Sequence, residues 1–189
     1  MNITLVIDSS GSMETIKDDA QGGINGLFKK FPDDKFTIIE FGKNEGAVVV
    51  CEGKKGKKCS YELNPTSGTD LYDAVGKAVC MLDFLEDNYF VLVSDGEENS
   101  SNKYNKEVFD DLTKLLEKNE VEFEFIGLAG FDAVNSSVGF GNAYVTSASA
   151  NYSISNTGTA FDVQAMKVGR FSADRQINPR RNKSKRVKK

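Results

Sequence analysis

A short apolar run followed at once by a carboxylate and hydroxyl groups most constrains what this chain can fold into. Residues 3–7 read Ile-Thr-Leu-Val-Ile, without a charge, and such a run predicts a buried strand. Asp8, Ser10 and Ser12 follow at alternate positions. Their oxygens suit a hard cation such as Mg²⁺, which prefers about six oxygen ligands in octahedral geometry. Three groups cannot fill that shell, so further ligands must come from elsewhere in the chain.

Two later segments can supply those ligands. Thr69 precedes an apolar-periodic stretch that predicts a helix over residues 70–86, so Thr69 is expected at the mouth of that helix. Asp95 directly follows a second buried strand, over residues 89–94. In an open parallel sheet, ligands gather beyond the carboxyl ends of the strands. We therefore expect Asp8, Thr69 and Asp95 to share one crevice.

These three segments resemble the von Willebrand factor A (vWA) family. The metal-ion-dependent adhesion site (MIDAS) of that family uses the pattern Asp-x-Ser-x-Ser, a distant Thr, and an Asp-Gly after a strand. The matching positions stand in the same order here: Asp8, Ser10, Ser12, Thr69 and Asp95. The resemblance covers roughly residues 1–170. It implies a Rossmann-like α/β fold, with helices on both faces of a mostly parallel sheet, and a bound Mg²⁺ or Mn²⁺ ion.

The chain itself also indicates this class of fold, because helix-like and strand-like patterns alternate along it. After the first strand we expect a helix over residues 14–31, a strand over residues 35–41 and a third strand over residues 47–51. The short link between these two strands predicts that the third is an antiparallel edge. Three glycines of the first helix are expected to let it lie close to the sheet: Gly22, Gly23 and Gly26.

Later elements follow from the same patterns. The expected segments are a helix over residues 105–117, a strand over 121–128, a short helix over 131–140, a short strand over 143–146 and a closing helix over 159–170. In the helix over 105–117, the residues expected to face inward are Val108, Leu112, Leu115 and Leu116. In the strand over 121–128, Glu122 and Glu124 are expected to alternate with inward apolar residues.

The net charge of −4 hides a division of the chain. From Arg170 onward there are nine Lys or Arg residues and one acidic residue, Asp174, so this end carries +8 and residues 1–169 carry −12. We expect a vWA domain over residues 1–170, followed by a basic tail over residues 171–189 with too few apolar residues to order itself. The tail could contact nucleic-acid phosphates, act as a localisation address, or neutralise an acidic domain.

Targeting signals are missing from the sequence. No segment approaches the roughly 20 apolar residues of a membrane span, and a strand follows Met1 too closely to leave room for a signal peptide. We therefore expect a cytoplasmic protein, similar to the stand-alone vWA proteins of bacteria and phages. Cys51, Cys59 and Cys80 are then expected as reduced thiols, and a Cys51–Cys59 bridge is the alternative in an oxidising compartment.

The expected function is binding. If the hydroxyls of Ser10, Ser12 and Thr69 bind the ion directly, the ligands are neutral. In the resembled family, acids such as Asp8 and Asp95 often act through bound waters. The ion then keeps an open position that the Asp or Glu carboxylate of a protein partner can fill.

Three other interpretations stay open from the sequence. The chain could be a nucleic-acid-associated protein that acts through its tail, or a metal-dependent hydrolase. The absence of histidine argues against an enzyme, because the commonest general base is missing. In the plainest interpretation, Asp8, Ser12 and Thr69 only form turns and helix caps.

Overall fold

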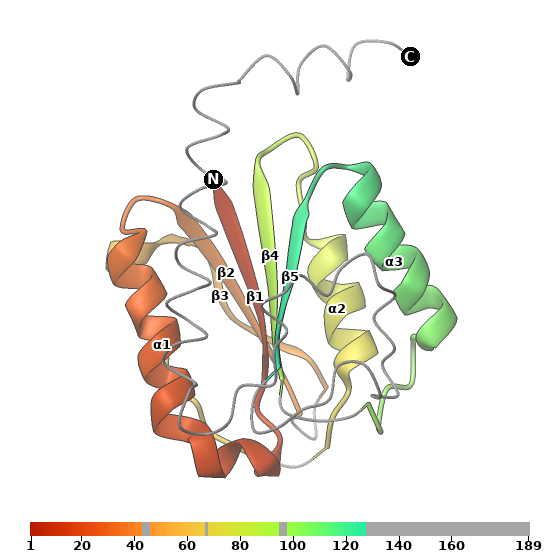
Figure 1. The fold of residues 1–189 in the computed structure, drawn as a ribbon, viewed down its shortest axis with the longest axis horizontal. Helices are drawn as coiled ribbons and strands as arrows, with labels where there is room; N and C mark the ends of the chain where they lie inside the picture. The colour runs from red at the N-terminus through yellow and green to blue at the C-terminus, as the bar shows by residue number, and fades with distance from the viewer. Residues whose placement is uncertain (43–45, 67, 95–97, 128–189) are drawn as a thin grey trace.

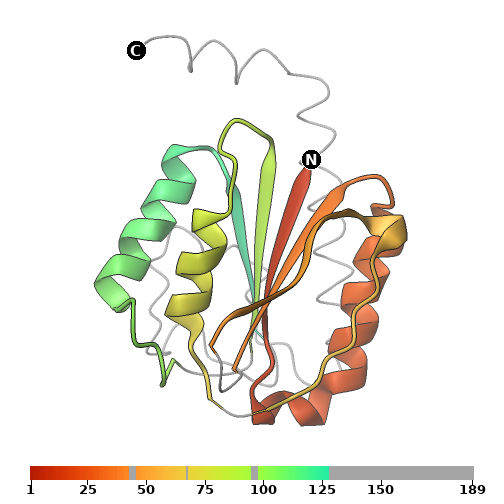
Figure 2. The ribbon, with the colours of Figure 1, turned by 180° about the vertical axis from the view of Figure 1, so that it is seen from behind.

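The computed structural model describes residues 1–42, 46–66, 68–94 and 98–127. These residues form one sheet with helices on both of its faces, as Figures 1 and 2 show from opposite sides. The expected α/β class is therefore confirmed. The elements expected after residue 128, the domain boundary at residue 170 and the basic tail lie outside the described residues.

The sheet has the strand order β3-β2-β1-β4-β5. The strands are β1 (Asn2–Asp8), β2 (Lys35–Phe41), β3 (Val48–Lys55), β4 (Asn88–Ser94) and β5 (Glu122–Gly127). Neighbouring strands pair in parallel, except that β3 pairs antiparallel with β2 as expected. The prediction that β3 ends at Cys51 was wrong, because its pairing with β2 continues past an irregularity to Lys54 and Lys55.

The helical segments also differ in detail from the prediction. They are the 3-10 helix η1 (Gly11–Ile16), α1 (Lys17–Lys30), the 3-10 turn η2 (Gly56–Lys58), α2 (Leu71–Cys80) and α3 (Lys106–Lys118). The first expected helix thus starts with a 3-10 segment. The helix expected over residues 70–86 ends at Cys80, because Met81 and Leu82 donate hydrogen bonds to carbonyls three residues back and tighten its last turn.

Two of the glycines of α1, Gly22 and Gly26, do not bring the helix close to the sheet. No atom lies within 4 Å of an ideal Cβ built at Gly22 or Gly26, so our expectation was wrong for these two positions. The helix instead packs through larger side chains such as Ala20, Ile24 and Leu27, which are buried. These α1 residues belong to an apolar cluster that includes Ile3, Leu5 and Ile7 of β1.

A second apolar cluster lies on the other face of the sheet, under α2 and α3 (Figure 2). The rings of Tyr72 on α2 and Phe109 on α3 are 5.1 Å apart and join the two helices. Phe109 and Leu116 form the inner side of α3, whereas Val108 and Leu115 are 36% and 39% exposed. The expectation that Val108 and Leu115 face inward was therefore wrong.

Glu124 on β5 also departs from prediction, because only 4% of it is exposed. The alternation of β5 places Glu124 on the same face as Ile126, which belongs to the cluster packed against α1. In the register it lies beside the buried Val91. This face of β5 therefore belongs to the interior rather than to solvent.

The connections of two neighbouring strands fix where a ligand would bind. β1 leads to α1 on one face of the sheet, while β4 leads to α3 on the other. In open α/β sheets, ligands bind at the carboxyl ends of two strands whose connections part in this way. Met1 lies at the opposite end of β1, where its amino group pairs with Asp34 at 3.1 Å.

Candidate metal centre

Asp8 is the last residue of β1, and none of it is exposed. Its Oδ1 accepts a hydrogen bond from the backbone N–H of Ser10 at 2.8 Å, and its Oδ2 accepts one from Ser94 Oγ at 2.6 Å. Hydrogen bonds to a buried carboxylate offset part of its cost of burial. The two bonds fix the carboxylate plane between the ends of β1 and β4.

The two serines of the Asp-x-Ser-x-Ser pattern lie side by side. Ser10 is buried and Ser12 is exposed, and their hydroxyl groups share a hydrogen bond of 3.0 Å between the Oγ atoms. Ser10 stands at the N-cap position of η1, but its side chain makes no capping hydrogen bond. Buried Met13 and Ile16 anchor η1 below these hydroxyls. Ser10 therefore does not cap η1 with its side chain.

Thr69 is held in place through its backbone. Its N–H lies 3.1 Å from Asn99 Oδ1 and 2.8 Å from Ser100 Oγ, and its carbonyl accepts hydrogen bonds from the backbone N–H groups of both residues. Only 5% of Thr69 is exposed. Its hydroxyl makes no hydrogen bond with any other described residue, so it is available to a ligand.

Glu98 holds the segment that clamps Thr69. Its Oε1 accepts hydrogen bonds from the N–H groups of Ser100 and Ser101, and its Oε2 accepts from Tyr72 N–H and Ser101 Oγ, all within 3.0 Å. Glu98 therefore caps the first turn of α2 from outside the helix. Its partner Tyr72 lies 26 residues away, so no local pattern could identify it.

A carboxylate on α2, that of Asp73, holds the segment that follows Glu98. Asp73 accepts hydrogen bonds from the backbone N–H groups of three successive residues, 102–104, at 2.8–3.3 Å. The ring of Tyr104 then lies where a side chain at Gly76 would be. Together with Glu98, these contacts fix residues 98–104 on the N-terminal half of α2.

Gly42 joins three loops at the centre of this edge, and sequence analysis did not identify it. Its φ is +95°, and an ideal Cβ there would lie 2.8 Å from Ser10 N and 2.9 Å from Gly68 O. Only glycine combines that φ with so close an approach. Its own N–H donates to Asp70 Oδ1 at 2.7 Å. Asp70 occupies the N-cap position of α2, but its side chain caps no N–H of that helix. Its carboxylate instead accepts the hydrogen bond from Gly42.

The segment over residues 59–66, which we call the strap, brings Thr69 to this edge. The strap lies along α1: Tyr61 exchanges two hydrogen bonds with the side chain of Asn25, and Leu63 N–H donates to Gln21 Oε1. At its end, Thr66 N–H donates to Ser9 O at 2.7 Å. Thr66 Oγ1 donates to Gly42 O at 2.7 Å.

The electrostatic environment of this edge is negative. Burial, followed by the charges of Glu40 and Asp8, raises the pKa of Tyr61. Glu40 is itself only 2% exposed and lies beside Ile7 in the register of β1 and β2. A cation at the end of β1 would therefore enter a field that favours it.

The residues present fit a small divalent cation. An octahedral ion with ligands at about 2.1 Å places neighbouring ligands about 3.0 Å apart, which matches the distance between Ser10 Oγ and Ser12 Oγ. In the described part of the chain, no three Cys, Asp or Glu side chains gather in a way that could hold a metal. Asp8, Ser10 and Ser12 lie together at the end of β1. The hydrogen bond from Gly42 N–H to Asp70 Oδ1 brings the residue after Thr69 to the same edge. Asp95, which follows Ser94, lies outside the described residues.

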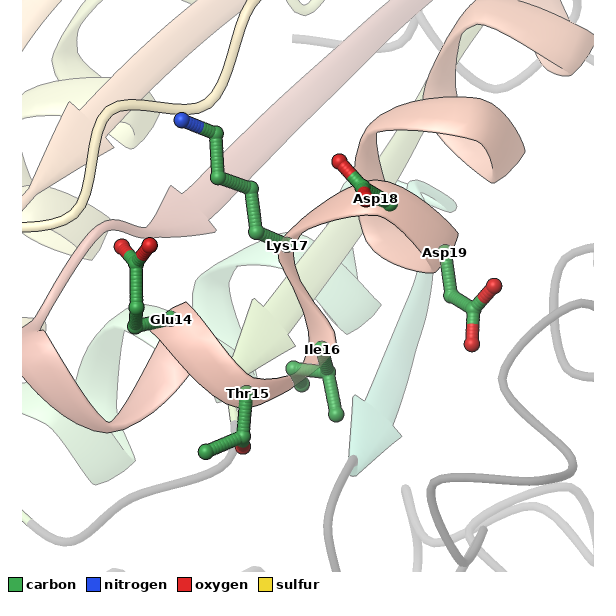
Figure 3. A pocket seen from close by; sticks show the side chains of 6 residues that line it. All are labelled: Glu14, Thr15, Ile16, Lys17, Asp18 and Asp19. Carbon is green, nitrogen blue, oxygen red and sulfur yellow. The ribbon is translucent and has the colours of Figure 1, made fainter.

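A separate hollow of about 490 Å³ lies on the outer side of the turn between η1 and α1. Six consecutive residues line it: Glu14, Thr15, Ile16, Lys17, Asp18 and Asp19. Figure 3 shows Glu14 and Lys17 pointing to one side of the turn while Asp19 points away from them. None of the candidate metal ligands lines this hollow.

Comparison with known proteins gives matches to solved structures alone. No protein-family model and no curated protein matches the sequence. Proximal thread matrix protein 1 of the mussel byssus matches with a TM-score of 0.62 and 15% sequence identity. The match covers 87% of this chain and 44% of the mussel protein's chain. A further structure of that protein has a zinc-occupied MIDAS motif.

Two structures from microorganisms also match this chain. The ArnB paralog VWA2 of Sulfolobus acidocaldarius has a TM-score of 0.59 and 22% identity, over 84% of this chain and 43% of its own. The vWF domain of the pilus tip protein Mfa5 of Porphyromonas gingivalis has a TM-score of 0.64 and 10% identity, over 89% of this chain and 94% of the matched chain. The likeness shows a vWA fold. The chain spans less than half of the mussel protein and of VWA2.

Proposed function

We propose that this chain is a metal-dependent protein-binding module. In this proposal Asp8, Ser10, Ser12, Thr69 and Asp95 form a MIDAS that holds a divalent cation, and an Asp or Glu side chain of a partner completes the coordination. The observation that carries the proposal is the 3.0 Å spacing of two serine hydroxyls beside the fully buried Asp8.

The residues have distinct parts in this proposal. Ser10, Ser12 and Thr69 offer neutral hydroxyl oxygens, so a bound cation would keep most of its charge for an anionic ligand. Asp8 already accepts one hydrogen bond on each oxygen, which suits a carboxylate that orients a metal-bound water. When bound, the cation supplies a Lewis-acidic position for a carboxylate oxygen of the partner.

The proposed ion is Mg²⁺ or Mn²⁺. The spacing of Ser10 Oγ and Ser12 Oγ supports an octahedral ion of this size. Zn²⁺ belongs in the same test, because a structurally similar mussel protein has zinc in its MIDAS motif.

We propose binding rather than catalysis. The sequence contains no histidine. Both oxygens of Glu98, which lies close to Thr69 through Asn99 and Ser100, are occupied by backbone and hydroxyl donors. The commonest general base is therefore missing, and Glu98 is not suited to take a proton from a substrate.

We also propose that the module acts in the cytoplasm as a stand-alone vWA protein of bacterial or phage type. Cys51, Cys59 and Cys80 are free thiols in the structure, the state that cysteines keep in a reducing compartment. None of the helices in the described part of the chain combines the length and apolar character that a membrane span requires. A second proposed partner is nucleic acid, which residues 171–189 would contact through their basic side chains.

The test of the metal centre uses two hydroxyls of the same 3-10 helix. Ser12 is a candidate ligand, whereas the exposed Thr15 only donates a weak hydrogen bond to Ser12 O at 3.3 Å. Calorimetric titration with Mg²⁺, Mn²⁺ and Zn²⁺ is expected to show binding by the wild type and by Thr15→Ala, and at least tenfold weaker binding by Ser12→Ala. Equal affinity in all three proteins would contradict the assignment.

Partner capture is tested separately. Extract of the source cells is passed over the immobilised chain in Mg²⁺ and in excess chelator, and the retained proteins are identified by mass spectrometry. The expected result is a partner retained only with metal, whose binding is lost when one Asp or Glu is changed to Asn or Gln. Equal retention under both conditions would place the binding surface elsewhere.

A further inference from the structure

Two of the three cysteines are in contact beside β3, the strand at one end of the strand order. Cys51 is on β3, and Cys59 follows η2 directly. Their Sγ atoms are 3.8 Å apart, with Cys51 8% exposed and Cys59 partly buried. We propose that Cys51 and Cys59 form a site of oxidative modification, at which a small-molecule disulfide converts the two thiols into an intramolecular disulfide bond.

The fold holds the two sulfur atoms in place before any bond forms. Seven residues separate the cysteines in the sequence. Cys59 N–H donates to Gly56 O at 2.9 Å, and Cys59 Sγ lies 3.4 Å from Lys55 O. On the other side, Cys51 Sγ lies 3.7 Å from Phe36 O of β2. The thiols are therefore in contact through the backbone geometry of β3 and η2.

The turn between the cysteines is itself fixed. Gly56 N–H donates to Asp34 O at 3.0 Å, and Lys57 N–H donates to Pro32 O at 2.9 Å. A Cβ at Gly56 would lie 2.7 Å from the carbonyl oxygen of Phe28, so η2 sits directly on the end of α1. The distance between the two Sγ atoms must shorten from 3.8 Å to about 2.05 Å for a disulfide bond to form. We expect the side chains to make this movement while the backbone of the turn stays in place.

Cys80 cannot take part in this bond. It ends α2, on the face of the sheet opposite to α1, whereas η2 packs against α1. Its side chain is exposed. Cys80 therefore serves as an internal control for thiol reactivity in the same molecule.

The reaction balances as two thiol–disulfide exchanges. The Cys59 thiolate, which is the more accessible of the pair, attacks one sulfur of a small disulfide such as oxidised glutathione and releases one small thiol. The Cys51 thiolate then attacks the Cys59 sulfur of the mixed disulfide and releases the second small thiol. The protein loses two electrons and two protons, and the small disulfide gains them.

The first exchange is expected to be slow at neutral pH. Burial, followed by the hydrogen bond with Cys51, raises the pKa of Cys59 to about 11. Since the thiolate is the nucleophile, the raised pKa slows the attack of Cys59 on the small disulfide.

The bond would link the edge strand β3 to the first residue of the strap. At its other end the strap contacts Ser9 and Gly42 through Thr66. A ring this short removes conformational freedom mainly from the unfolded chain. Oxidation is therefore expected to raise the melting temperature by about 5–10 °C.

The experiment exposes the full chain to oxidised glutathione at pH 8.5 and then blocks free thiols with an alkylating reagent. We expect a linked peptide pair that contains Cys51 and Cys59, while the exposed Cys80 carries either one alkyl group or one glutathione. Reduction before blocking should restore three alkylated thiols. The Cys80→Ser variant should form the same bond and carry no alkyl group after oxidation.

Three outcomes would overturn the proposal. They are a glutathione adduct that stays on Cys59 without closing the ring, full alkylation of Cys51 and Cys59 after oxidation, and linkage of either cysteine to Cys80. Because the wild type and Cys80→Ser retain both thiols of the pair, the result does not depend on the folding of Cys51→Ser or Cys59→Ser. It is also independent of metal binding.

Discussion

Ser94 Oγ donates a hydrogen bond of 2.6 Å to Asp8 Oδ2, and both residues are fully buried at the ends of neighbouring parallel strands. The contact joins residues 86 positions apart. It orients the carboxylate on which the proposed metal centre depends. The same contact brings the end of β4, which leads into Asp95, against the end of β1.

Replacing Ser94 by Ala should affect both stability and metal binding. A buried hydrogen bond to a charged group contributes about 1.5–3 kcal/mol, so Ser94→Ala is expected to lower the free energy of unfolding by that amount and to weaken Mg²⁺ binding. Ser9→Ala is the matched control, because Ser9 Oγ is equally buried but donates to Phe41 O at 2.6 Å. Urea unfolding and calorimetry should show lost stability in both variants and weaker metal binding only in Ser94→Ala.

Gly42 provides a sharper test of the loop junction. Gly42→Ala places a methyl group against Ser10 N and Gly68 O at a positive φ, and we expect it to cost at least about 2 kcal/mol of unfolding free energy. Gly22→Ala, on the exposed side of α1 with open space around it, should instead stabilise the domain by up to about 1 kcal/mol. Similar effects of both variants in urea unfolding would contradict the proposed junction.

Glu98 is predicted to position Thr69 without touching the metal. Glu98→Gln keeps the size of the side chain but turns an NH₂ group toward N–H donors, so we expect a loss of about 1–3 kcal/mol in unfolding free energy and weaker Mg²⁺ binding. Glu62 is exposed, and Glu62→Gln should change neither quantity. Metal affinity equal to that of the wild type in Glu98→Gln would show that the clamp on Thr69 does not depend on this carboxylate.

Tyr61 should determine part of the alkaline stability of the domain. Burial and the charges of Glu40 and Asp8 raise the pKa of Tyr61 in the folded state, so folding favours the protonated phenol. The stabilising contribution is complete below the unfolded pKa of about 10 and is lost as the pH rises through the folded pKa.

The variant Tyr61→Phe removes that titration. Tyr61 Oη is buried and has no hydrogen-bond partner of good geometry among the described residues, so Tyr61→Phe is expected to be at least as stable as the wild type at pH 7. It should also unfold at a higher pH than the wild type when alkaline unfolding is followed by circular dichroism. Identical alkaline midpoints would show that Tyr61 does not control this transition.

The sequence predicted the features that depend on local patterns. The bounds of β2 follow from an apolar run, and the antiparallel pairing of β3 follows from the short link between the two strands. The stop of α2 at Cys80 was not predicted, because it depends on the i→i+3 bonds of Met81 and Leu82.

The residues that sequence analysis missed act across long separations. Gly42 contacts Ser10 and Gly68, and Glu98 bonds to Tyr72 on another element. No periodicity in one segment records such contacts. Glu124 was misassigned for a related reason, since its burial depends on what covers that face of β5 rather than on its own alternation.

The direction of the strands has a practical consequence for display of the domain. The amino group of Met1 lies at the end of β1 farthest from Asp8 (Figure 1). A tether through the N-terminus would leave the edge with Asp8, Ser12 and Thr69 facing solution. It would also remove the positive charge of the Met1 amino group, which pairs with Asp34. Beads or sensor chips coated in this orientation would present every copy with the edge of the proposed metal centre outward.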